Sequence, residues 1–229
     1  DSVTLLGALT TFYFSANIFF GFDGQATQYK LATIMPGIDI SFHIEPLGIV
    51  FSLLASGLWI LTHIYAIGYM RGAKEKNHSR FFFFFSVSIA SVMGISFSGN
   101  LFTLFLFYET LTLITFPLVS HKGSNEALRG ARVYLSILLG TSIGLQLLGI
   151  IWIYFSVGTL DFVKGGILNG SFGSLELTLL VALFAFGIGK AALFPFHRWL
   201  PAAMVAPTPV SALLHAVAVV KAGVFTVLK

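Results

Sequence analysis

The chain has 229 residues, of which 56% are hydrophobic and 10% are charged, and a soluble domain of this composition would expose far too much apolar surface. The net charge of +4 does not indicate nucleic-acid binding, because the basic residues cluster in short segments beside apolar stretches, as they do in membrane proteins. There is no cysteine, which excludes disulfides, thiolate chemistry and cysteine-ligated iron–sulfur clusters.

Apolar stretches of about twenty residues predict membrane-spanning helices, whereas a transmembrane barrel would need alternating strands of about ten residues. In chain order, the expected spans are residues 3–20, 47–70, 81–98, 101–120, 133–155, a sixth that begins near Leu177, and a seventh that follows residues 207–209. The sequence therefore predicts an all-α polytopic membrane protein with about seven transmembrane helices, in a single transmembrane domain over residues 1–229.

Two segments depart from this helical pattern. The stretch IDISFHIEP, residues 38–46, alternates apolar and polar residues and predicts a short strand or hairpin at the membrane surface. In the sixth span, Pro195 lacks a backbone donor and clashes with the preceding turn, so the helix is expected to kink or break there. Gly187 and Gly189, in the motif GIGK, permit close backbone approach or local unwinding beside Lys190.

The chain does not begin with methionine and ends inside an apolar run, as expected of a fragment of a longer protein.

Lysine and arginine are divided unequally between the segments on the two sides of the membrane. One side has only Lys30 and Lys164. The other side collects eight basic residues: Arg71, Lys74, Lys76, Arg80, Lys122, Arg129, Arg132 and Arg198. The positive-inside rule therefore places residues 71–80 and 121–132 in the cytoplasm or its topological equivalent.

Three ionisable residues are predicted near the middle of different helices: Glu109, Lys190 and Lys221. A charge at the bilayer centre costs several kcal/mol, so each is a candidate functional residue. A carboxylate and an ammonium can pair, each favouring the charged form of the other, while burial favours the neutral forms. One interpretation is a static Glu–Lys pair that holds two helices together. The second lysine is left without a mid-membrane partner, which argues instead for a hydrated cavity.

Histidines add groups that titrate near neutral pH, and His197 and His215 flank the break between the two lysine-bearing helices. His197 has an alternative interpretation as an interfacial residue beside Arg198 and Trp199. His63 lies inside an apolar span, where hydrogen bonding to a neighbour is the more common role. A bis-histidine haem would need two facing histidines at one depth, and nothing in the sequence supports such a pair.

A resemblance to a known family is carried by two stretches, FGIGKAALFPFHRWLPAAMVAPTPVSALLHAVAVVKAGVF and FYETLTLITFPLVSH. They resemble the antiporter-like proton-translocating subunits shared by respiratory complex I, Mrp-type cation/proton antiporters and energy-converting hydrogenases. Such proteins contain two inverted five-helix repeats, and the resemblance implies that residues 81–229 form the first repeat. It also implies that Glu109 pairs with Lys190 of the broken helix, that Lys221 is the next relay lysine, and that His215 lies beside the path. The second repeat is absent from this sequence, so the resemblance implies at most a half-channel.

The main hypothesis is a proton-translocating or cation/proton-antiporting membrane subunit of a multisubunit complex. Its relay residues would be Glu109, Lys190, Lys221, His215 and His197. No cofactor and no metal are expected in this chain, and any redox centre would belong to partner subunits. The expected partners are other membrane subunits, lipid, protons and Na⁺, and the expected location is the prokaryotic inner membrane. The alternative is a non-conducting scaffold subunit that retains the fold, while a haem or quinone redox protein is disfavoured.

Overall fold

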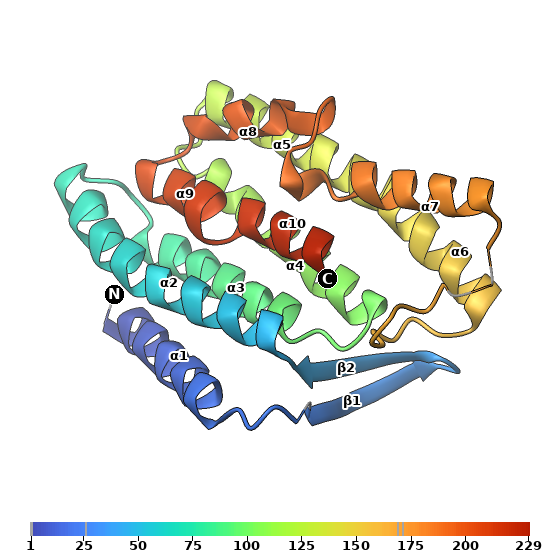
Figure 1. The fold of residues 1–229 in the computed structure, drawn as a ribbon. Helices are drawn as coiled ribbons and strands as arrows, with labels where there is room; N and C mark the ends of the chain where they lie inside the picture. The colour runs from blue at the N-terminus through green and yellow to red at the C-terminus, as the bar shows by residue number, and fades with distance from the viewer. Residues whose placement is uncertain (1, 26, 169, 171) are drawn as a thin grey trace.

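The computed structural model describes residues 2–25, 27–168, 170 and 172–229, which form a layered bundle of helices with a β-hairpin at one end (Figure 1). The elements are α1 (Ser2–Gly21), β1 (Thr27–Met35), β2 (Ile38–Ile44), α2 (Pro46–Gly72), α3 (His78–Ser96), α4 (Leu101–Val119), α5 (Asn125–Thr141), the π-helix η1 (Ser142–Gln146), α6 (Leu147–Val157), α7 (Ser174–Gly187), the 3₁₀ turn η2 (Gly189–Ala191), η3 (Phe196–Arg198), α8 (Trp199–Ala202), η4 (Ala203–Val205), α9 (Thr208–Ala212), the π-helix η5 (Leu213–Val217) and α10 (Val219–Leu228). Among the described residues, six segments are long and apolar enough to cross a membrane, and α7 is a shorter apolar helix. The predicted all-α polytopic membrane fold is confirmed.

The fifth span is longer than the apolar run that predicted it. It begins at Asn125 rather than at residue 133 and reaches Val157. The Ser124 hydroxyl caps its first turn by accepting a hydrogen bond from the Ala127 N–H, at 3.1 Å. The first turns of α5 carry basic residues, so apolar patterning assigned them to a loop.

The segment of residues 38–46, predicted to form a short strand or hairpin, contains the strand β2, whose hairpin partner β1 lies in the preceding residues, where no strand was predicted. Strands β1 and β2 pair antiparallel, with Lys30 opposite Ser41, and the Lys30 Nζ lies 2.6 Å from Asp39 Oδ2. This hydrogen bond holds the pKa of the Asp39 carboxyl below its usual value. The hairpin is attached to the helices by the His43 N–H, which donates to Phe97 O at 2.7 Å.

The connecting segments are gathered at two opposite ends of the bundle (Figure 1). The α2–α3 and α4–α5 connections lie together at one end, where Arg80 Nη2 donates to His121 O at 3.4 Å. The hairpin and the α6–α7 segment lie at the other end, where the Leu101 N–H donates to Leu160 O at 2.9 Å. The two strongly basic connections therefore share one side, as the charge distribution requires, and the cytoplasmic assignment of that side remains a prediction.

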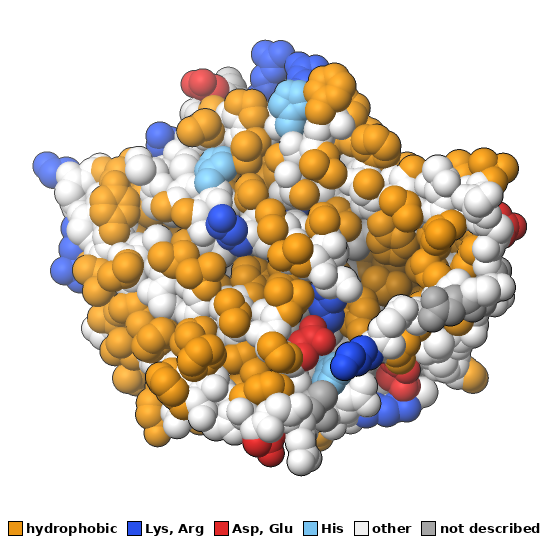
Figure 2. Space-filling model, in the orientation of Figure 1, with side chains coloured by type: hydrophobic (Ala, Val, Ile, Leu, Met, Phe, Trp, Pro, Cys, Tyr) orange, Lys and Arg blue, Asp and Glu red, His pale blue; other side chains and the backbone are white. Residues whose placement is uncertain are grey.

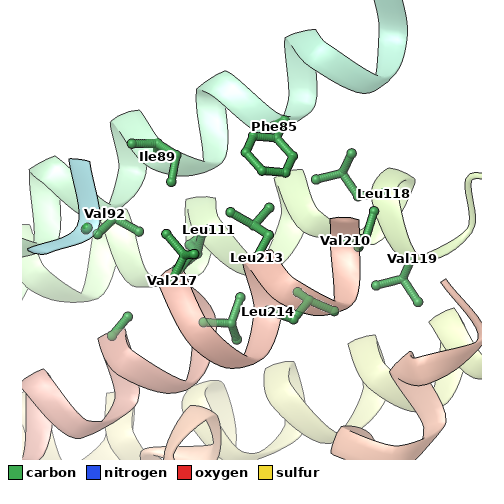
Figure 3. Close-up of a cluster of buried hydrophobic side chains, with 14 of the residues drawn as sticks. Phe85, Ile89, Val92, Leu111, Leu118, Val119, Val210, Leu213, Leu214 and Val217 are labelled. Carbon is green, nitrogen blue, oxygen red and sulfur yellow. The ribbon is translucent and has the colours of Figure 1, made fainter. Parts of the chain in front are cut away.

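The core lies between α3, α4 and the last span. Its side chains point toward one another from these three elements in Figure 3 and include Phe85, Ile89, Val92, Leu111, Leu118, Val119, Val210, Leu213, Leu214 and Val217. Lipid tails are as apolar as these residues, so close packing rather than exclusion from water holds membrane helices together. The last span is thereby fixed at the centre of the bundle.

The last span also packs directly on the broken part of the chain. A Cβ atom added to Gly223 in α10 would lie 2.3 Å from the Ala191 nitrogen and 2.5 Å from the Lys190 carbonyl carbon. Both neighbours are backbone atoms and cannot rotate away. Glycine at this position therefore sets how closely α10 approaches the break.

We expect Gly223→Ala to destabilise the full subunit by about 1–3 kcal/mol, because the added methyl group forces the two backbones apart. Gly68→Ala is the matched control, because nothing lies within 4 Å of a Cβ added at this position in α2. Thermal unfolding of the purified complex measures both. Equal unfolding temperatures for the two variants would contradict the close approach.

Candidate functional site

The sixth span ends at a break that the neighbouring fifth span shapes. Helix α7 stops at Gly187, and the chain continues through 3₁₀ turns before α8 begins at Trp199. A Cβ atom at Gly187 would lie 2.5 Å from the Gln146 nitrogen, and one at Gly189 would lie 2.2 Å from Thr141 Oγ1. The predicted break is therefore present, and it begins upstream of Pro195, where the glycines let the fifth span come into contact with the backbone.

Lys190 is enclosed completely at this break, with 0% of its surface exposed. Its Nζ donates to the Tyr108 carbonyl oxygen at 2.8 Å and to the Thr112 hydroxyl, and it lies 3.2 Å from the centroid of the Tyr108 ring. Tyr108 and Thr112 are four residues apart and so share one face of α4. Among the described residues, this face supplies both hydrogen bonds of the Lys190 amine.

The backbone of the break is held by two aromatic side chains. The Lys190 N–H donates to the Tyr108 hydroxyl at 3.0 Å, and Trp199 Nε1 donates to Gly189 O at 2.8 Å. Backbone groups released by a helix break need such partners inside a membrane. Tyr108 thus contacts Lys190 through its carbonyl, its ring and its hydroxyl.

Glu109 lies next to this contact but does not form the ion pair expected with Lys190. Among the described residues, no carboxylate lies within 4.0 Å of Lys190 Nζ, and both Glu109 oxygens are buried without a hydrogen-bond partner. The Ser142 hydroxyl faces the carboxylate but donates its hydrogen to Leu138 O, at 2.7 Å. Tyr108 and Thr112 hold the amine on the adjacent face of α4.

His215 and Lys221 both lie on the last span. His215 is in the π-helix η5, and its Nδ1 lies 2.7 Å from the Ser211 carbonyl oxygen. A carbonyl oxygen only accepts, so Nδ1 carries a hydrogen, and the buried Nε2 has no hydrogen-bond partner among the described residues. Lys221 is exposed on the surface of this chain. Figure 2 shows isolated basic and histidine side chains within a largely hydrophobic face over α9 and α10.

His197 is not joined to Lys190. It is exposed, and its ring stacks on the Phe194 ring with 5.7 Å between centroids. The structure therefore brings Lys190 and Glu109 to one place, puts the helix of Lys221 and His215 against the break, and leaves His197 at the surface.

His63, on α2, contacts the Thr4 hydroxyl through Nε2 at 3.0 Å, as expected of a histidine bonded to a neighbour.

Sequence reasoning missed Tyr108 and Thr112, which hold Lys190, and Gln146, which lies against Gly187. The polar pair at positions 108 and 112 flanks Glu109 at helical spacing and was a usable signal.

Within the described part of the chain, no group of three His, Asp or Glu residues could hold a metal ion.

A groove of about 1070 Å³ opens between α7, α10 and the α6–α7 segment. Its floor includes Leu104, Phe184 and Ile188, and Figure 2 shows the hollow lined by hydrophobic side chains with charged ones at its rim. At the rim, Lys229 Nζ pairs with Glu45 Oε1 at 2.5 Å.

The Lys190 contacts are compatible with both charge states of the amine. A carbonyl or hydroxyl oxygen accepts an N–H from an ammonium and from a neutral amine alike. The two hydrogen bonds therefore hold the amine against α4 in either charge state.

Comparisons with known proteins give consistent matches over nearly the whole chain. The sequence model of "NADH:quinone oxidoreductase/Mrp antiporter, TM" matches residues 98–229, and that of "NADH-Ubiquinone oxidoreductase (complex I), chain 5 N-terminus" matches residues 35–82. A Staphylococcus haemolyticus protein named as an antiporter subunit, mnhA2, is 35% identical over 228 residues, which covers 96% of this chain and 28% of that protein. The chloroplastic NAD(P)H-quinone oxidoreductase subunit 5 of Ipomoea purpurea is 33% identical over 239 residues, which covers 99% of this chain and 33% of that protein.

A solved structure has the same arrangement of helices. The Mrp complex from Dietzia sp. DQ12-45-1b aligns with a TM-score of 0.86 and 26% identity, over 97% of this chain and 24% of that chain. The chain thus spans a third or less of each of these relatives. The matches and the six apolar spans confirm a multi-pass integral membrane protein, and the bacterial relatives support the inner membrane as its location.

We expect Tyr108→Phe to lower the stability of the full subunit by about 1–3 kcal/mol, because the buried Lys190 N–H then loses its acceptor while the ring is retained. Tyr65→Phe is the control, because Tyr65 is 49% exposed on α2. The measurement is thermal unfolding of the purified complex. A Tyr108→Phe complex that unfolds at the same temperature as the control would show that the hydroxyl does not hold the break.

Proposed function

Because the chain belongs to the family of NADH:quinone oxidoreductase and Mrp antiporter transmembrane subunits, we propose that it is the proton-translocating part of a membrane subunit in a multisubunit complex. One observation carries the proposal: a fully buried lysine is held by neutral acceptors at a helix break, beside a buried carboxylate that has no bonded partner among the described residues. Intramembrane ionisable groups mark ion and proton pathways.

Lys190 is the proton carrier in this proposal. A proton bound by the amine leaves the contacts with Tyr108 and Thr112 in place, so loading requires no rearrangement of the break. The charge on Glu109 controls this loading, because opposite charges interact strongly where water is scarce. An ionised Glu109 favours the ammonium form of Lys190, and protonation of Glu109 favours release of the proton.

The onward route leads along the last span. Gly223 packs on the backbone of Lys190, which brings α10 to the break. His215 presents a buried ring nitrogen that has no hydrogen-bond partner among the described residues, and Lys221 is the next amine on this span. Lys221 is exposed on this chain, and an ammonium in hydrocarbon is costly, so water or further protein is expected to cover it in the membrane. His197 is exposed beside the break, and its proposed part is at the water-facing end of the route.

Cation exchange is proposed for the complete subunit only. The Staphylococcus haemolyticus relative is named as an antiporter subunit, which supports coupling of protons to a cation such as Na⁺. Other membrane subunits are the proposed partners, since the similar Dietzia structure is of a complex. The alternative, a scaffold without conduction, is less favoured because a scaffold gains nothing from a buried carboxylate that has no bonded partner.

We expect Lys190→Ala to lower proton flux at least about tenfold in proteoliposomes of the assembled complex, because a proton carrier is removed from the route. Lys164→Ala is the matched control, since it removes an exposed lysine in the α6–α7 segment. A pH-sensitive dye inside the vesicles reports flux, and the subunit content of the purified complex reports assembly. Wild-type flux in an intact Lys190→Ala complex would make the scaffold the better account.

A further inference from the structure

The two lysines at the depth of the helix break have opposite surroundings. Lys221 lies in α10 two residues before Gly223, which packs on the backbone of Lys190, so Lys221 lies close to the depth of the break. Lys190 is fully buried, whereas Lys221 is exposed on the surface of this chain. An ammonium that faces hydrocarbon is costly, so the exposure of Lys221 on a membrane span needs a physical explanation.

Lys221 has no room to turn inward, because the opposite side of α10 is packed. Ala222 is fully buried, and the Phe225 ring stacks on the Phe51 ring of α2 with 4.8 Å between centroids. A rotation of α10 that buried Lys221 would pull these side chains out of their contacts. The partner of the ammonium must therefore come to the outward side of α10.

The described residues offer Lys221 no carboxylate. Residues 177–229 contain no Asp or Glu. Helix α10 packs chiefly on η2, η5, α4 and α3, and the one carboxylate in these four elements is that of Glu109, whose oxygens are both buried. Lys229, the residue after α10, does pair with a carboxylate, that of Glu45. Of the two lysines carried by this helix, only Lys229 has its counter-charge in this chain.

The side chains beside Lys221 favour a helix over water or lipid as its cover. Val224 and Leu228 follow Lys221 by three and seven residues and share its side of α10, and they are 44% and 65% exposed. The face around them is largely hydrophobic (Figure 2), whereas an ordered water needs two to four polar partners. Lipid tails supply no anion. A neighbouring helix can supply both apolar contact and an anion.

We propose that the outward side of α10 around Lys221 is the docking surface for a membrane-spanning helix outside residues 1–229, and that this helix carries an aspartate or glutamate opposite Lys221. The carboxylate balances the ammonium, and Val224 and Leu228 supply the apolar contact. The inference goes beyond the proposed function, because it depends on the membrane location of the span and holds whether or not Lys221 carries a proton.

The first test is Lys221→Met, measured by thermal unfolding of the assembled complex. Methionine is apolar and similar in length, so against lipid the loss of the charge would raise the unfolding temperature. Against a carboxylate, the variant leaves a buried charge without its partner, and the unfolding temperature is expected to fall by at least about 5 °C. Lys164→Met is the control, since Lys164 is exposed in the α6–α7 segment. A Lys221→Met complex as stable as the wild type, or more stable, would overturn the proposal.

The second test exchanges the charges of the pair. Lys221→Glu places two carboxylates opposite each other, so the yield of assembled complex is expected to fall at least about tenfold, whereas Lys164→Glu retains it. Each Asp and Glu in the other membrane spans of the complex is then changed to Lys in the Lys221→Glu background. Recovery of the complex by one such change, which lowers the yield when Lys221 is present, identifies the partner helix. Failure of every exchange to restore assembly would overturn the proposal.

Proton flux in the same preparations keeps this inference apart from the proposed function. Lost flux in an intact Lys190→Ala complex, together with an undiminished unfolding temperature in Lys221→Met, would overturn the docking surface and leave the proposed function standing. Wild-type flux in an intact Lys190→Ala complex, together with a successful charge exchange at Lys221, would overturn the proposed function and support the docking surface.

Discussion

An amine inside a membrane must have acceptors for its hydrogens, and the arrangement of Lys190 against α4 meets that constraint. The carbonyl of Tyr108 and the hydroxyl of Thr112 accept from the amine, and the Tyr108 ring lies beneath it. The backbone is held as well: the Lys190 N–H donates to the Tyr108 hydroxyl, which it can do because the chain leaves the helical path at Gly187, whereas in a continuous helix this N–H would bond within the helix's own ladder. The approach of the fifth span at Gly187 and of α10 at Gly223 completes the enclosure.

The absence of a bonded Glu109–Lys190 pair in the described residues changes what each group can do. A buried ion pair with short contacts is held together by the attraction between its charges. Here, neutral oxygens hold the amine in place, and the Glu109 carboxyl group lies nearby without a hydrogen-bond partner among the described residues. In the proposed function, position and charge are thereby separated: α4 fixes where Lys190 lies, and Glu109 influences whether it carries a proton. Two functions that one ion pair would combine are divided between neighbouring residues of a single helix.

Much of the fold could be predicted from the sequence, because lipid admits only helices and their apolar runs have the length of a bilayer. A strand or hairpin at residues 38–46 was likewise predicted from alternation, and a break in the sixth span from Pro195, although the strand β1 and the start of the break at Gly187 were not predicted. The two π-helices could not be predicted, since Ser142–Gln146 and Leu213–Val217 have ordinary helical residues and the extra residue per turn depends on packing.

The exposure of Lys221 and His197 could not be predicted either, because helical spacing gives the depth of a residue but not the element that its side chain faces. Whether residues 81–229 form one five-helix repeat remains a prediction.

The absence of cysteine from the chain permits a direct test of whether the charge on Lys190 carries function. Lys190→Cys introduces a unique thiol into this chain, and alkylation with 2-bromoethylamine converts it into a thioether analogue of lysine. The account predicts that proton flux is lost in the cysteine variant and returns after aminoethylation, but not after attachment of an uncharged ethyl group of similar length. Mass spectrometry confirms each modification, and the treated wild-type complex controls for other subunits. Flux that stays absent in a fully aminoethylated, intact complex, or that returns with the uncharged group, would contradict the account.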